Sequence, residues 1–313
     1  AIISVFLGDQ LEDVLEQLIS TGTATHSIRG GKLQTGVRTL PDLNKDATDR
    51  NRTSPFAFTG NKFEFRMVGS SDSVAGPNVV LNTIVADAFR EACDEMEQAE
   101  DLDLCIHDLI KKYATEHHRI VFNGNGYSKA WVEEAERRGL PNIDNMVDAI
   151  PYLKDEKAVS LFERFGVFTR AELESRVEIK YETYSKIINI EARSMIDIAT
   201  KQIIPAVVKY TTVLANSINS VRMAADDVDV SVQKDLLSET SCLLRRSKTA
   251  LEELKVLTDQ ASAMEPGEEQ AKFYNRKVMT AMEQLRKPVD ELEMLVDKEM
   301  WPMPSYGDLL FEV

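Results

Sequence analysis

Residues 62–68 read Lys-Phe-Glu-Phe-Arg-Met-Val and alternate between charged and apolar side chains as far as Met67. A period of two predicts a β-strand, because successive side chains of a strand point to opposite faces of the sheet. The two phenylalanines and the methionine would share one face, and Lys62, Glu64 and Arg66 would share the other. This charged face is either exposed to solvent or lines a polar site.

The chain before this strand contains fewer periodic segments. Residues 2–7 alternate briefly and predict a short strand, and apolar residues at helical spacing over 11–19 predict a helix that Gly22 closes. Residues 23–60 are rich in Gly, Thr, Asp, Asn and Pro, which predicts an extended loop region.

Short helices are predicted directly after the strand. Pro77 lies where an apolar helix would begin, and that helix would continue toward Met96. Another helix follows through Ile106 and Ile110. Ser128 can cap a further short helix that ends near Gly139.

The pattern changes at residue 169. Residues 169–172, Thr-Arg-Ala-Glu, form a capping-box sequence, which predicts the start of a long helix. Helical spacing then continues past residue 200, with a kink expected at Pro205. Two more amphipathic stretches follow, one ending at the Pro-Gly break at 266–267 and one from Phe273 to Val296. Three such helices predict a bundle, so the fold class is α+β with a mainly helical C-terminal part.

Composition excludes several classes of function. The chain of 313 residues carries 52 acidic and 37 basic residues, a net charge of −15, which disfavours binding to a phosphate backbone and excludes nucleic acid as a partner. Charged residues interrupt every apolar run, so we expect no membrane span and a soluble protein. The three cysteines are widely spaced and support neither a metal motif nor a disulfide framework, which favours a cytoplasmic location.

The charged strand face has the residue types that phosphoryl transfer requires. Divalent cations bind carboxylate oxygens, and guanidinium groups hold phosphate oxygens in pairs. Glu64 could supply the first, and Arg66, together with Arg52 in the preceding loop, could supply the second. From the pattern alone, a face that is merely solvated stays open as the alternative.

Three segments carry a family resemblance. Residues 51–71 read NRTSPFAFTGNKFEFRMVGSS, residues 122–128 read FNGNGYS, and residues 301–306 read WPMPSY. Together these segments resemble the C-terminal catalytic signature of glutamine synthetases, and their details resemble the type III subfamily. The resemblance implies the end of a glutamine-synthetase-type catalytic antiparallel sheet followed by a helical bundle.

The resemblance also implies a role for each residue of the motif. Glu64 would be a metal ligand between nucleotide and substrate, and Arg66 would hold glutamate. Arg52 would steady the transferring phosphoryl group, and Lys62 would take the place of a nucleotide-side arginine. One departure is Ala57, which stands where the best-known type has a second arginine.

The activity that the resemblance implies is ligation of glutamate and ammonium by ATP, through a γ-glutamyl phosphate, with Mg²⁺ or Mn²⁺. The other metal ligands of the family precede the NRT motif. Because the chain begins Ala-Ile-Ile-Ser without an initiator methionine, we expect a piece of a longer protein that is inactive without its N-terminal catalytic portion.

The expected organisation has three parts. Residues 1–76 would complete the catalytic sheet domain, residues 77–168 would continue it with helices, and residues 169–313 would form a long-helix extension. The resemblance implies a homo-oligomer, a ring-forming dodecamer. Two alternatives stay open: a non-catalytic helical oligomerisation or interaction module, and another kinase of related fold such as a guanidino kinase.

Overall fold

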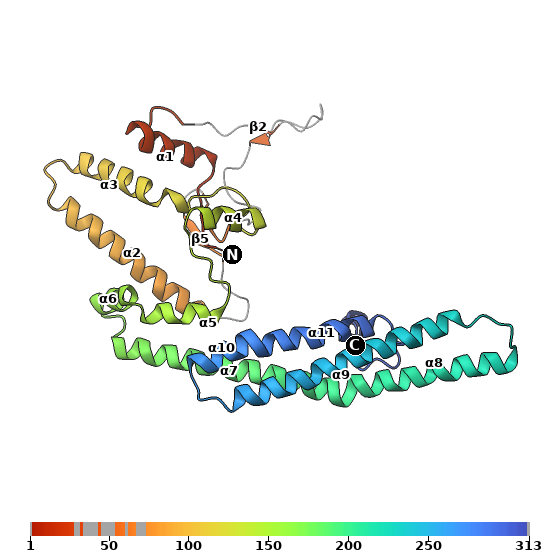
Figure 1. The fold of residues 1–313 in the computed structure, drawn as a ribbon. Helices are drawn as coiled ribbons and strands as arrows, with labels where there is room; N and C mark the ends of the chain where they lie inside the picture. The colour runs from red at the N-terminus through yellow and green to blue at the C-terminus, as the bar shows by residue number, and fades with distance from the viewer. Residues whose placement is uncertain are drawn as a thin grey trace. The chain divides into compact units, whose positions relative to one another are not determined.

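The protein is mainly helical, with a small β-sheet near the N-terminus (Figure 1). It divides into two compact units. Residues 1–149 and 155–169 form the first, here called the mixed unit, and residues 150–154 and 170–313 form the second, here called the helical unit. The computed structural model describes residues 2–27, 32–33, 43–44, 54–59, 62–66 and 73–311, with only the backbone at 32–33 and 43–44.

The sheet of the mixed unit has three short strands. They are β1 (Val5–Phe6), β4 (Phe56–Phe58) and β5 (Phe63–Phe65), in the order β1-β4-β5. β4 pairs with β5 in antiparallel fashion, but β1 runs parallel to β4, so the expectation of an antiparallel sheet was wrong for this pair. A separate antiparallel pair consists of β2 (Lys32–Leu33) and β3 (Leu43–Asn44).

The strand predicted over 62–68 is confirmed at its centre, as β5. Its partner β4 lies in a region that we predicted to be loop, because three residues are too few to show a period. The apolar faces of both strands meet: the Phe56 ring stacks on Phe63 with centroids 5.5 Å apart, and Phe58 lies 5.3 Å from Phe63. These contacts leave the opposite face of the hairpin to Ala57 and the charged residues.

The helices of the mixed unit follow the predicted order. The helix α1 ends at Gly22, whose φ of 80° is the left-handed conformation that a helix end requires. Ser128 caps α4 by accepting a hydrogen bond from the Trp131 amide. The helices are α1 (Asp9–Thr21), α2 (Ala75–Met96), α3 (Leu102–His117), α4 (Lys129–Arg137), α5 (Met146–Ala149) and α6 (Glu156–Arg164), with a 3₁₀ turn at His118–Ile120.

Asn123 joins the end of β1 to the start of α1. Its Oδ1 accepts hydrogen bonds from the amides of Leu7 and Gly8, both at 3.0 Å. Its Nδ2 donates to Glu12 on the first turn of α1. The neighbouring amide of Phe122 donates to the carbonyl of Val5, so the 121–123 segment continues the edge of β1.

Trp131 anchors the N-terminal residues on the other side. Its side chain is fully buried and donates through Nε1 to the carbonyl of Ile2 at 3.2 Å. Phe122 stacks on its ring with centroids 4.2 Å apart, and the Arg138 guanidinium lies 5.5 Å from the indole centroid. The start of the chain is therefore fixed by side chains more than a hundred residues away.

In the helical unit, three long helical segments run side by side, as Figure 1 shows. The predicted helices are confirmed, and two of them contain π-helical turns. The elements are a 3₁₀ turn at Ile150–Lys154, α7 (Arg170–Ile198), a π-helical turn at Ala199–Ile203, α8 (Ile204–Ala224), α9 (Ser231–Ser262), α10 (Glu268–Phe273), a π-helical turn at Tyr274–Val278, α11 (Met279–Glu293) and α12 (Tyr306–Phe311).

The core of this unit has the spacing of a coiled coil. The buried positions of α9 follow one another at intervals of three or four residues, which places them on one face of the helix. Leu251 and Leu254 of that face are fully buried and belong to a cluster with Leu285 of α11 and Ile188 of α7. Burying each leucine contributes about 1.5–3 kcal/mol.

The expected kink at Pro205 coincides with a π-helical turn. Pro205 has no amide hydrogen and so cannot donate to the carbonyl four residues before it. The π-helical turn at Ala199–Ile203 ends directly before the α8 segment that contains this proline. Such turns occur where the regular helical hydrogen bonding is interrupted.

Among the described residues, no helix is both long and apolar enough to cross a membrane.

Candidate functional site

The charged face of the β4–β5 hairpin is the candidate site. The register pairs Ala57 directly with Glu64, so the two side chains lie on the same face of the sheet. Ala57 is fully buried, whereas the Glu64 side chain is 41% exposed. The residue at which the sequence departs from the family pattern therefore lies opposite the predicted metal ligand.

Glu64 is held between two cations. Arg66 donates to its Oε2 from Nε at 3.2 Å and from Nη2 at 3.0 Å, and the Lys62 Nζ lies 3.7 Å from Oε1. The Arg66 side chain is only 16% exposed, whereas that of Lys62 is 67% exposed. Lys62, Glu64 and Arg66 thus converge on one face, as the alternation predicts.

The backbone holds this face in place. The Arg66 amide donates to the carbonyl of Pro55, and the Thr59 amide donates to the carbonyl of Lys62, both at 2.8 Å. The buried hydroxyl of Ser54 donates to the carbonyl of Phe56 at 3.0 Å. These bonds extend the hairpin by one residue beyond each end of its strands.

Electrostatics favours the ionised carboxylate at this position. The hydrogen bond from Arg66, with the charges of Arg66 and Lys62, lowers the pKa of the Glu64 carboxyl below its usual value, although partial desolvation opposes the shift. A carboxylate that stays ionised suits a hard divalent cation. It supplies one ligand: the described residues contain no group of three His, Cys, Asp or Glu side chains that could hold a metal by themselves.

The fourth predicted site residue, Arg52, lies outside the described residues, so its distance from Glu64 is not defined. Sequence reasoning also missed the role of Asn123. The FNGNGYS segment suggested only turns, but Asn123 fixes the loop after β1, the strand next to β4. The one sequence signal for Asn123 was its position in the FNGNGYS segment, which resembles type III glutamine synthetases.

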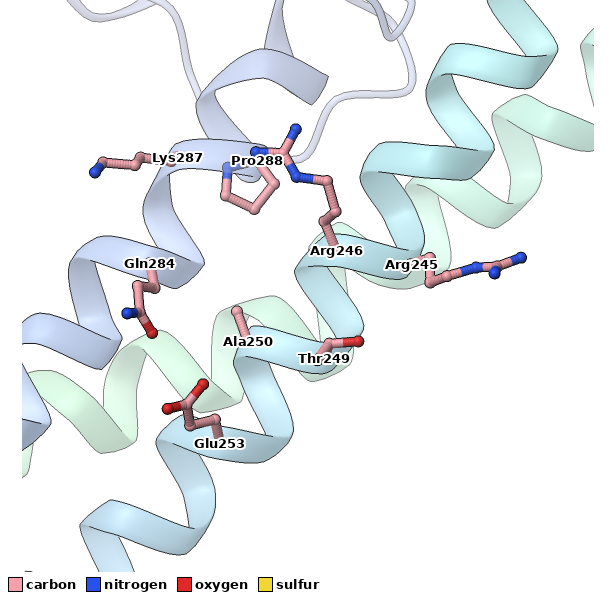
Figure 2. Close-up of a pocket in the computed structure, with 8 residues that line it drawn as sticks. All are labelled: Arg245, Arg246, Thr249, Ala250, Glu253, Gln284, Lys287 and Pro288. Carbon is pink, nitrogen blue, oxygen red and sulfur yellow. The ribbon is translucent and has the colours of Figure 1, made fainter.

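A separate pocket of about 390 Å³ lies between α9 and α11 of the helical unit. Two arginines, a lysine and a glutamate are among its lining residues, but their charges do not converge. Figure 2 shows Arg245 and Lys287 extending away from each other. Arg246 pairs with Glu291 at 3.2 Å, which occupies its guanidinium.

The comparisons with known proteins agree with the motif. The family model for the glutamine synthetase C-terminal domain matches residues 105–222. A type-3 glutamine synthetase from Dictyostelium discoideum is 38% identical over 318 residues, which cover 99% of this chain and 43% of that protein. Glutamine synthetases from Bacteroides fragilis and Butyrivibrio fibrisolvens are 34% and 35% identical, over 99% and 100% of this chain.

The chain belongs to the glutamine synthetase family. The resemblance to type III glutamine synthetases that the motifs indicated is therefore confirmed. The chain spans less than half the length of these curated relatives, 43% to 45%. The helical unit and the hairpin site both fall within the aligned region, because the alignments cover nearly the whole chain.

Proposed function

We propose that this chain contributes the Glu64 face to the active site of a glutamate–ammonia ligase, which forms glutamine from glutamate and ammonium at the expense of ATP. The observation that supports the proposal most directly is the convergence of Arg66 and Lys62 on the Glu64 carboxylate, within the motif that resembles the family signature. The family membership supports the reaction type.

In this proposal, each residue has a separate task. Glu64 would bind Mg²⁺ or Mn²⁺ with an ionised oxygen, and the cation would offset negative charge on the transferring phosphoryl group. Arg66 would hold the substrate carboxylate, and Arg52 would stabilise the phosphoryl group in the transition state. Lys62, the most exposed of the described three, would contact the nucleotide.

One carboxylate cannot complete a site for divalent cations, so the proposal assigns the remaining ligands to a portion of the protein that precedes these residues. Residues 1–313 alone should then not form glutamine. We further propose that the whole protein works as a ring-shaped homo-oligomer in the cytoplasm, with residues 169–313 as a subfamily-specific extension.

The test compares variants of the whole protein that contains this chain. Glu64→Gln keeps the size of the side chain but removes its charge, so ATP- and Mg²⁺-dependent glutamine formation should fall at least a hundredfold, with a weaker apparent affinity for Mn²⁺. Glu283→Gln is the matched control, because Glu283 is exposed on α11. Unchanged activity in Glu64→Gln would refute the assignment of Glu64 as a metal ligand. Robust glutamine formation by residues 1–313 alone would refute the interpretation that this chain needs the rest of the protein for activity.

A further inference from the structure

A second pocket in the helical unit is built differently from the one in Figure 2. It has a volume of about 180 Å³ and lies where the middle of α7 meets the end of α9 and the start of the third long segment. This volume is below the range of about 300–1,000 Å³ that is typical of pockets for drug-sized ligands. That is too little for a nucleotide and fits a small metabolite. The lining residues are Glu182, Ser185, Lys186, Asn189, Ser262, Pro266, Gln270 and Tyr274.

One of the lining residues has a buried hydroxyl without a protein partner among the described residues. Ser185 is 4% exposed, and within the part of the chain that the structure describes its Oγ makes no hydrogen bond. A buried hydroxyl without a partner costs free energy, so a lining atom of this kind points to a ligand or to ordered water. Helical serines commonly bond to the carbonyl one turn back, and Ser185 does not.

The walls of the pocket are held rigidly by other hydrogen bonds. The side-chain Nε2 of Gln270 donates to the backbone carbonyls of Ala261 and Met264, at 3.1 and 3.2 Å. These two bonds fix the break between α9 and α10. The Ser262 hydroxyl lies 3.2 Å from Asn189 Oδ1 and 3.3 Å from the Tyr274 hydroxyl. The shape is therefore formed before any ligand binds.

Tyr274 brings an irregular backbone to the pocket. It is 2% exposed and is the first residue of the π-helical turn Tyr274–Val278. Such turns are rare and are found frequently at functional sites, because the extra residue aims a side chain differently from the rest of the helix. The Tyr274 side chain belongs to the core cluster, and its hydroxyl lies beside Ser262.

The charges at the mouth of the pocket select the class of ligand. Lys186 and Glu182 are the only Lys, Arg, Asp or Glu residues in the lining, and they pair with each other at 2.5 Å. Their formal charges cancel, and Arg193, which donates to the lining side chains of Asn189 and Ser262, is itself paired with Asp259 at 3.5 Å, so the pocket favours neither an anion nor a cation. A molecule with both charges can pair with Lys186 and Glu182 at once, whereas a singly charged molecule can pair with only one of them.

We propose that this pocket binds a small zwitterion of the size of a free amino acid. Its carboxylate contacts Lys186, its ammonium contacts Glu182, and a polar side chain reaches the Ser185 hydroxyl. The site lies wholly within the helical unit and is independent of the ligase site, so the proposal does not rest on the proposed function.

The experiment measures binding to the 313-residue chain by calorimetry or by ligand-observed NMR. The probe is L-threonine. Two analogues each lack one charge: 1-aminopropan-2-ol has no carboxylate, and 3-hydroxybutanoate has no ammonium. Threonine should bind saturably, and both analogues should bind at least fivefold more weakly. Equal binding of all three would contradict the zwitterion assignment, and no saturable binding of threonine would mean that the pocket holds water only, which overturns the proposal.

Variants locate the site. Ser185→Ala should weaken threonine binding about two- to tenfold, the range expected for one hydrogen bond. Ser247→Ala is the matched control: Ser247 is also buried without a hydrogen-bond partner among the described residues, but it does not line this pocket. Circular dichroism checks that each variant folds. Tyr274→Phe and the exposed Lys186→Met provide further tests, and unchanged affinity in all three pocket variants would refute the assignment.

Discussion

Replacing Asn123 with alanine should destabilise the mixed unit far more than its partly buried position would suggest. The substitution removes three hydrogen bonds, two of them from the amides of Leu7 and Gly8, both of which are buried. At about 0.5–1.5 kcal/mol for each bond, and more where a buried amide is left without a partner, the loss should be about 2–4 kcal/mol.

The assay uses the two tryptophans of the chain. Trp131 lies in the mixed unit and Trp301 in the helical unit, so in a Trp301→Phe background the fluorescence of Trp131 follows the mixed unit alone. Urea unfolding with a slope of about 2 kcal/mol per molar should then show the midpoint falling by about 1–2 M in Asn123→Ala.

Asn125→Ala is the control, because Asn125 is exposed and, among the described residues, its side chain accepts only from the Tyr127 amide two residues later. It should change stability by less than about 1 kcal/mol. Asn123→Asp sharpens the test: the two acceptor bonds can persist, but the donor to Glu12 is lost, so only part of the loss in stability should remain. Equal losses in Asn123→Ala and Asn125→Ala would refute this account.

Further substitutions test the packing and the electrostatics. Ala57→Leu should cost the mixed unit about 1–3 kcal/mol in urea unfolding, since Ala57 is fully buried opposite Glu64 and the extra carbons must displace neighbours. Leu254→Ala should cost the helical unit about 2–5 kcal/mol, seen by circular dichroism at 222 nm with Trp131 fluorescence unmoved, because Leu254 is fully buried in the α9 seam. The hydrogen bond from Lys298, with those from Ser305, lowers the pKa of Asp308 to about 2. The Asp308 carboxyl should therefore titrate near pH 2 in an NMR titration, and a midpoint near pH 4 would contradict this prediction. The stability that the Asp308 carboxylate gives to α12 is complete above the unfolded pKa of about 3.9 and should be lost as pH falls toward 2.

The amino-acid sequence by itself determined the local elements of this protein. The alternation around Glu64 predicts the strand and the shared face of Lys62 and Arg66, because side-chain direction in a strand depends only on residue parity. The helices after residue 169 follow from apolar spacing, and Gly22 and Ser128 mark helix ends for stereochemical reasons that act within a few residues. The resemblance to type III glutamine synthetases likewise rests on short motifs.

Only the tertiary structure decided which distant residues meet. β4 has three residues and no periodic signal, so it exists as a strand through its pairing with β1 and β5. The residues that follow β1, Leu7 and Gly8, are held by Asn123, more than a hundred positions later in the chain. The pocket at Ser185, whose hydroxyl has no partner among the described residues, likewise depends on how α7, α9 and α10 pack. Local patterns cannot specify such contacts, because they arise from the relative placement of elements and not from the conformational preference of any one of them.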